Sequence, residues 1–366
     1  MSKLFSTIAL GNLNLTNRVM VAPMCQYSGI DGKAQPWHEQ HIGQLVCSGA
    51  GAITMEATAV EPNGMITYGC LGLWNQSQED VLRQLLNRLR TYSSSPIGIQ
   101  LNHAGRKASA HPPWKGGKPL DQQDGWASFA PSSIPWGEGW PLPEYLTTER
   151  MQEINNAFVD SAKRAERVGF NYIELHCAHG YLLHSFLSQI SNQREDEYGG
   201  SRANRMKYPL RVLQSVRNTL NKDTVLGVRI NGTDWLEEGW QLEDAVVFAK
   251  QLEELGINYV SVSSGGACGG VAYPKEEAYQ VELASRIRSE LQIPVICAGL
   301  INDPHNANVI VEEGKADIIA LARAVLHNPK WPHMAARMLG TPLEQPRQHW
   351  AVVPEAWPFL NGTLKP

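Results

Sequence analysis

One unit recurs in the second half of the chain and limits the folds that the chain can adopt. In each copy an amphipathic helix ends at a glycine, and a short polar step then leads into an apolar strand. The three glycines are Gly169, Gly256 and Gly314. Glycine ends a helix at this position because it adopts the left-handed conformation without a steric penalty. A helix followed by a strand without polar alternation is half of a βα unit of a parallel sheet.

Further apolar runs extend this pattern to eight predicted strands. We expect the strands near residues 18, 52, 96, 170, 225, 259, 294 and 317, with helices between them. Eight parallel strands separated by helices are most economically arranged as a closed (β/α)8 barrel, the TIM barrel of the α/β class. A doubly wound open sheet is the alternative. It is disfavoured because no Gly-x-Gly-x-x-Gly turn follows the first strand.

Three segments fall outside the repeating unit. Residues 4–15 alternate around Gly11, which predicts an N-terminal hairpin that closes the bottom of the barrel. Residues 108–144, after the third strand, are rich in proline, glycine and tryptophan and are too long for an ordinary connection. We interpret this long loop as a functional cover of the barrel top, with an inconsequential surface excursion as the alternative. We therefore expect one barrel domain over 1–340 and a C-terminal tail over 341–366.

Composition argues against several classes of function. The 366-residue chain has a net charge of -4 and no run of lysine or arginine, which argues against nucleic-acid binding. No apolar stretch approaches the roughly 18 residues that a membrane span needs. The first ten residues lack the apolar core of a signal peptide. Six cysteines are scattered without a Cys-x-x-Cys pair, so we expect reduced thiols and a cytoplasmic protein.

The fourth predicted strand opens into a His-x-x-His-x-Tyr loop made of His176, His179 and Tyr181. A barrel presents its reacting groups at this end of its strands. The two histidines can donate hydrogen bonds to one oxygen or anion, and the tyrosine can deliver a proton. Two histidines three residues apart could instead bind zinc, although no third ligand stands out, or they could simply be buried.

Polar residues after other strands favour a flat, anionic ligand. Gly299 and Arg323 follow strands seven and eight, where barrels bind phosphate groups. Gln100 and Arg229 offer an amide and a fixed cation nearer the middle. This pair suits a heterocycle whose edge becomes negative on reduction, as in a flavin. The alternative for Arg229 is a salt bridge in the core.

Several collinear motifs carry a resemblance to a known family. They are the segments 22–27, 56–60, 98–101, 103–108, 174–176, 179–182, 191–194, 196–201 and 204–205. From about residue 17 to about residue 350, the chain resembles the Old Yellow Enzyme family of FMN-dependent ene-reductases, and most closely its thermophilic-like and xenobiotic-reductase branch. The resemblance implies tightly bound, non-covalent FMN that NADPH or NADH reduces.

The resemblance also implies which residues hold the cofactor. They are Pro23, Met24, Cys25, Ala57, Gln100 and Arg229 at the ring system, and Ala298, Gly299, Ala322 and Arg323 toward the phosphate. Cys25 would lie near the reactive edge of the ring and tune its potential, whereas a plain buried cysteine is the alternative. Ala322 departs from the pattern, because we expect glycine before the arginine.

For the reaction, the resemblance implies that His176 and His179 bind the activating oxygen of an α,β-unsaturated carbonyl or nitro compound, with Tyr27 assisting. Tyr181 would then supply the proton after flavin hydride transfer. The chain would be an NADPH dehydrogenase or enoate reductase that acts on small molecules, without metal, nucleic acid or membrane. It would be a homodimer or homotetramer, with the tail at the subunit interface. A metal-dependent barrel hydrolase and a non-catalytic flavin-binding protein are the alternatives.

Overall fold

The computed structural model describes residues 2–352, 356 and 357. Eight parallel strands form one continuous sheet in which the last strand pairs with the first, so the sheet closes into a barrel. These strands are β3 (Val19–Val21), β4 (Ala52–Ala59), β6 (Ile97–Asn102), β9 (Tyr172–Cys177), β10 (Val225–Asn231), β11 (Tyr259–Ser263), β12 (Val295–Cys297) and β13 (Ile318–Leu321). The predicted (β/α)8 barrel and its eight strand positions are confirmed. The predicted tail, 341–366, lies partly outside the described residues.

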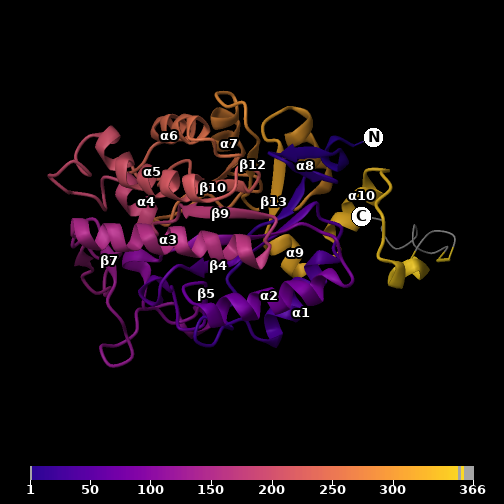
Figure 1. The fold of residues 1–366 in the computed structure, drawn as a ribbon. Helices are drawn as coiled ribbons and strands as arrows, with labels where there is room; N and C mark the ends of the chain where they lie inside the picture. The colour runs from indigo at the N-terminus through magenta and orange to yellow at the C-terminus, as the bar shows by residue number, and fades with distance from the viewer. Residues whose placement is uncertain (1, 353–355, 358–366) are drawn as a thin grey trace.

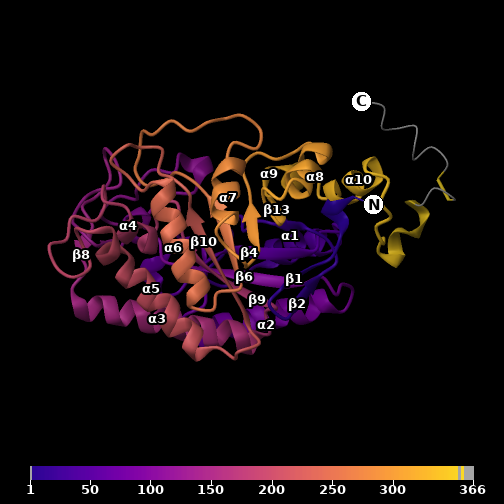
Figure 2. The ribbon, with the colours of Figure 1, turned by 90° about the horizontal axis from the view of Figure 1, so that it is seen from above.

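Helices surround the strands in both views of the ribbon (Figures 1 and 2). They are α1 (Pro36–Val46), α2 (Gln76–Arg90), α3 (Thr148–Val168), α4 (Leu182–Leu187), α5 (Arg202–Thr219), α6 (Leu242–Glu254), α7 (Val281–Arg288), α8 (Pro304–Glu312), α9 (Arg323–His327) and α10 (Trp331–Met338). Gly169, Gly256 and Gly314 follow α3, α6 and α8 with φ of 92°, 78° and 70°. These left-handed glycines end the helices as the sequence predicts.

The predicted N-terminal hairpin is present as β1 (Ile8–Leu10) and β2 (Leu13–Leu15), which pair antiparallel. Leu10 and Leu15 pack in one apolar cluster with the rings of Tyr172 and Tyr259, which project from barrel strands. A Cβ atom on Gly98 would lie 2.1 Å from the Tyr172 ring. Glycine at this position therefore allows a large ring to fill the barrel interior.

The long loop over 108–144 contains η4 (Pro113–Lys115), β7 (Phe129–Ala130) and β8 (Glu144–Tyr145). It contacts segments that follow barrel strands: Trp114 packs edge-on against Tyr27, and Trp136 Nε1 donates a hydrogen bond to the carbonyl of Gly266. The loop therefore covers the carboxyl ends of the strands.

The short strand β5 (Leu71–Gly72) pairs with β4. No helix within the described residues is long and apolar enough to cross a membrane.

Candidate active site

His176, His179 and Tyr181 lie together where β9 ends and α4 begins. The ring centroids are 5.0 Å apart between the two histidines and 4.8 Å apart between His176 and Tyr181. His176 is buried, and the other two side chains are partly buried. The convergence predicted from the sequence is therefore present. No group of three His, Cys, Asp or Glu side chains suitable for a metal ion occurs in the part of the chain that the structure describes.

Burial keeps both histidines neutral. Desolvation, followed by the charge of Arg229, holds the pKa of His176 and of His179 well below the usual value. Nδ1 of His176 accepts the backbone N–H of Ala178 at 3.1 Å, so its proton resides on Nε2. Nε2 of His179 lies 2.7 Å from Oγ of Ser263. His176 therefore offers a neutral N–H donor to a ligand.

The hydroxyl of Tyr181 retains its proton over a wide pH range. Burial raises the pKa of Tyr181 well above its usual value, and the nearby Cys25 and Tyr27 contribute to this rise. The ammonium group of Lys107 lies 4.8 Å from the centre of the Tyr181 ring. Burial and the neighbouring Arg106 lower the pKa of Lys107 to about 7. The tyrosine is thus a protonated donor beside a titratable cation.

Cys25 and Tyr27 face the same apolar cluster as Tyr181 and Ala57. Burial raises the pKa of Cys25 well above its usual value, so the sulfur is a thiol rather than a thiolate. Tyr27 has φ of 48°, an uncommon conformation for a residue with a side chain. The residue before it is held by Glu56, whose carboxylate accepts the backbone N–H of Gln26 at 2.9 Å. Glu56 lies within β4, and no role was predicted for it from the sequence.

A cavity of about 580 Å³ opens at His179, which lines it together with Arg229 and Ser263. Its lining includes most of the residues predicted to hold the cofactor, namely Pro23, Arg229, Ala298, Gly299, Ala322 and Arg323. Ser263, Tyr279 and Gln280 also line it and were not singled out from the sequence. Met24, Cys25, Ala57 and Gln100 are not part of this lining. Cys25 and Ala57 instead lie in the apolar cluster with Tyr181.

Arg229 and Gln100 fit a flat heterocycle with alternating donors and acceptors. The guanidinium of Arg229 forms no ion pair within 4.0 Å of a described residue, and its buried Nε has no partner, which disfavours the core salt bridge. Gln100 donates its Nε2–H to the buried carboxylate of Glu174 at 2.7 Å. Its carbonyl oxygen is therefore left as an acceptor. Tyr259 donates a second hydrogen bond to Glu174 at 3.2 Å.

The other end of the cavity suits an anion. Gly299 has φ of 117°, and a Cβ atom there would meet the side chain of Gln280 at 3.0 Å. Glycine is therefore favoured here by the left-handed backbone and by the close packing of Gln280. Ala322 has φ of -118°, so alanine occupies the position without left-handed strain. Backbone N–H groups and the guanidinium of Arg323 are the chemistry that a phosphate requires. The donor set as a whole fits FMN.

Comparisons with known proteins show the family to which this chain is similar. The sequence model of the NADH:flavin oxidoreductase / NADH oxidase family matches residues 3–341. An NADPH dehydrogenase of Geobacillus thermodenitrificans is 38% identical over 350 residues, which cover 94% of this chain and 97% of the relative. An NADH:flavin oxidoreductase of Gibberella zeae is 37% identical over 366 residues, which cover 95% and 88%. Among solved structures, morphinone reductase superposes with a TM-score of 0.77 at 27% identity, covering 95% and 92%.

Proposed function

The chain belongs to the NADH:flavin oxidoreductase / NADH oxidase family and is a flavin-dependent oxidoreductase of the Old Yellow Enzyme type, and from this premise we propose that it is an ene-reductase. The proposed reaction is reduction of the C=C bond of small, electron-poor alkenes, namely α,β-unsaturated carbonyl or nitro compounds. One observation carries the proposal: two neutral histidines and a protonated tyrosine converge beside a cavity that Arg229 lines.

We assign the cofactor to the cavity and to the strand ends that border it. Pro23, Arg229, Gly299 and Arg323 would hold FMN directly, and Gln100 would accept a hydrogen bond from its ring. Met24, Cys25, Ala57, Ala298 and Ala322 complete the proposed site. When bound, FMN takes a hydride from NADPH or NADH and delivers a hydride to the alkene. The positive charge of Arg229 favours the negative charge that reduction brings to the ring.

His176 and His179 would bind the activating oxygen of the substrate. Tyr27, in the segment that follows β3, would assist. Neutral imidazoles suit this role because an N–H donor stabilises negative charge as it develops on the oxygen. A fixed pair of donors also orients the alkene. Ser263 holds Nε2 of His179, which limits rotation of the ring.

Tyr181 would protonate the carbon that is left negative. Its raised pKa keeps the proton in place at neutral pH, and the ammonium of Lys107 over the ring would offset charge that develops on the phenol oxygen. Replacing Tyr181 by phenylalanine is expected to slow enone reduction by about 100-fold or more, the usual contribution of a positioned proton donor. Reduction by NADPH would remain, because that step needs no such donor.

The visible absorption spectrum of the FMN-loaded protein tests the reaction class. We expect anaerobic NADPH to bleach the flavin bands and cyclohexenone to restore them. Bleaching without restoration by any enone would favour a non-catalytic flavin-binding protein. A colourless protein that takes up no FMN and binds zinc would favour the metal-dependent hydrolase.

Titration with a phenol tests the two histidines separately from turnover, because a phenolate oxygen occupies the place of the substrate oxygen. The double variant His176→Ala, His179→Ala is expected to weaken phenol binding by about 100-fold, since two hydrogen-bonding side chains are lost. Unchanged phenol affinity with full FMN content would contradict the assignment. We further propose, from the family resemblance, a homodimer or homotetramer, which light scattering would test.

A further inference from the structure

The turn that carries His179 has an unusual backbone. His179 has φ of 59° and Gly180 has φ of 73°, so two consecutive residues are left-handed. Such a conformation is uncommon for a residue with a side chain and persists only where surrounding contacts impose it. A Cβ atom on residue 180 would lie 2.2 Å from the carbonyl oxygen of Gly266, so only glycine fits there. This His179–Gly180 bend needs external support.

Three polar side chains supply that support, each through a backbone atom of the bend. Asn231 Oδ1 accepts the N–H of His179 at 3.1 Å, and Lys107 Nζ donates to the carbonyl of His179 at 2.8 Å. His184 Nδ1 accepts the N–H of Gly180 at 3.0 Å. All three supporting residues come from outside the bend, and two of them are themselves oriented by one buried carboxylate.

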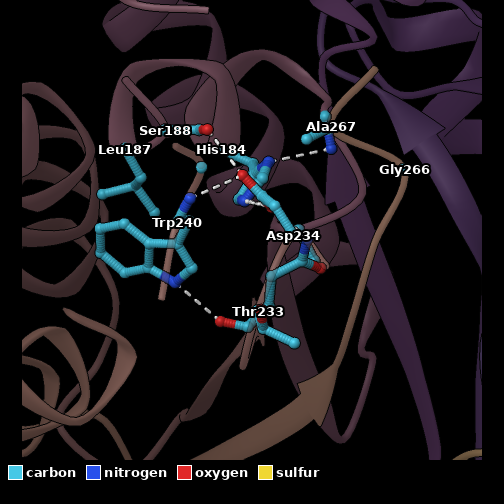
Figure 3. Close-up of polar contacts among 12 residues, drawn as sticks. His184, Leu187, Ser188, Thr233, Asp234, Trp240, Gly266 and Ala267 are labelled. Atoms are coloured by element: carbon cyan, nitrogen blue, oxygen red, sulfur yellow. Dashed lines mark hydrogen bonds and ion pairs between the residues drawn. The ribbon is translucent and has the colours of Figure 1, made fainter. Parts of the chain in front are cut away.

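That carboxylate is Asp234, which is fully buried and lies between His184, Ser188 and Trp240 (Figure 3). Its Oδ2 accepts hydrogen bonds from the hydroxyl of Ser188 at 2.6 Å and from the backbone N–H of Trp240 at 2.9 Å. Burial opposes the charge, but His184, Ser188 and the Trp240 N–H together hold the pKa of Asp234 below its usual value. The group is therefore an anion that only accepts hydrogen bonds.

An acceptor-only group dictates the orientation of its neighbours. Nε2 of His184 lies 3.1 Å from Oδ1 of Asp234 as an ion-pair contact and has no hydrogen-bond partner among the described residues, while Nδ1 accepts the N–H of Gly180. The proton of His184 therefore belongs on Nε2, which leaves Nδ1 free to accept the Gly180 N–H. Asn231 donates its Nδ2–H groups to Oδ1 of Asp234 at 3.1 Å and to the carbonyl of Gly265 at 2.8 Å, and this orientation leaves its Oδ1 for His179.

We propose that His184 and Asp234 are positioning residues for the substrate-binding loop. Asp234 sets the tautomer of His184 and the amide orientation of Asn231, and these two acceptors hold the His179–Gly180 bend that aims His179 at the substrate. The proposal rests on the proposed function in one respect, since it takes His179 to be a ligand of the substrate oxygen.

Two replacements of His184 separate its two contacts. In H184N the side-chain oxygen stands close to the place of Nδ1, so Gly180 keeps an acceptor while the contact with Asp234 is lost. In H184Q the amide reaches toward Asp234, but Gly180 loses its acceptor. We expect phenol affinity of the FMN-loaded protein to fall about tenfold in H184Q, because a buried donor is left unpaired. In H184N it should stay within about threefold, because that donor is paired.

S188A is the matched control. It removes a hydrogen bond from the far oxygen of Asp234 and leaves the contacts with His184 and Asn231 in place. Phenol affinity in S188A should equal that of the wild type. Equal losses in H184N and H184Q, or a loss in S188A as large as that in H184Q, would overturn the proposal, because the network would then act only through general packing.

A second measurement is made on the wild-type protein and does not depend on the proposed function. The ¹⁵N spectrum of histidine-labelled wild-type protein reports which ring nitrogen carries the proton, and comparison with H184N or H184Q assigns the signals of His184 among the eleven histidines. We expect a neutral ring protonated at Nε2. A proton on Nδ1 would refute the positioning role. A wild-type protein that binds no phenol but shows the expected tautomer would instead refute the proposed function.

Discussion

Charge at the inner edge of the cavity depends on two buried groups that are not in direct contact. Arg229 supplies the cation, and Glu174 is the carboxylate whose charge acts most strongly on it. Burial raises the pKa of Glu174, but Arg229 and the hydrogen bonds from Gln100 and Tyr259 oppose that rise and favour the anion. The same carboxylate orients the amide of Gln100. Glu174 is therefore placed to adjust how strongly the site favours a reduced, negatively charged ring.

Replacing Glu174 by glutamine removes the charge and keeps the shape. Arg229 would then lose its counter-charge, and the reduced flavin would be favoured. We expect the potential of bound FMN to rise by about 30 mV or more, which corresponds to a tenfold change for a two-electron couple. Spectroelectrochemical titration measures it. Tyr259→Phe is the control, because it removes a hydrogen bond to Glu174 without removing charge. An unchanged or lower potential in Glu174→Gln would exclude the coupling.

The interior of the barrel depends on glycines that face aromatic rings. A Cβ atom on Gly227 of β10 would lie 2.0 Å from the Tyr259 ring, and one on Gly98 of β6 would meet Tyr172 equally closely. Tyr172 has no room to move, because it is fully buried and its hydroxyl lies 2.9 Å from Oγ1 of Thr54. These glycines thus let β9 and β11 fill the layer beneath the active site.

Gly98→Ala is therefore expected to destabilise the protein by about 1–3 kcal/mol through overpacking. Gly137→Ala is the comparison, because the nearest atoms to its added methyl group lie at 3.4 Å, an ordinary contact distance. It should change the free energy of unfolding by less than about 0.5 kcal/mol. Urea denaturation of the two variants measures the difference. Equal stability of both variants would mean that the Tyr172 ring shifts without cost.

Strands and helices were predictable because their signals are local. Apolar runs that follow Gly169, Gly256 and Gly314 mark strand positions within a few residues of the chain. The path of the 108–144 loop was not predictable, because it depends on contacts with distant segments, such as that of Trp136 with Gly266.

The residues of the candidate site were likewise predictable only where the sequence signal is local. His176, His179 and Tyr181 stand at a strand end that the sequence marks, and they converge as predicted. No local sequence pattern predicts the contact between His184 and Asp234, because these residues are 50 positions apart in the chain. Lys107 lies in a recognised motif, but its position over Tyr181 follows only from the packing of two loops.

At the scale of the whole molecule, buried neutral histidines link folding to pH. Burial, followed by the neighbouring His38, lowers the pKa of His41 to about 4, and burial lowers that of His333 to about 4 as well. His176 and His179 are shifted in the same direction. In the unfolded chain these side chains titrate near pH 6.5. Between about pH 6.5 and 4 the unfolded state therefore binds more protons than the folded state.

The stability that these histidines contribute should accordingly be complete above about pH 6.5 and decrease as the pH falls toward 4, since an unfolded state that binds more protons is favoured by acid. Carboxylates with lowered pKa values, such as Glu79, lose their contribution only below about pH 4.5 and do not explain a decrease at pH 5.5. Urea denaturation with saturating FMN at pH 7.5, 6.5 and 5.5 measures the effect.

His41→Gln removes one of the responsible groups, so the stability of this variant should depend less steeply on pH than that of the wild type. Because both proteins bind the same cofactor, protonation of the FMN phosphate cancels in the comparison. Parallel pH profiles for the two proteins would show that His41 is protonated as readily in the folded state as in the unfolded chain.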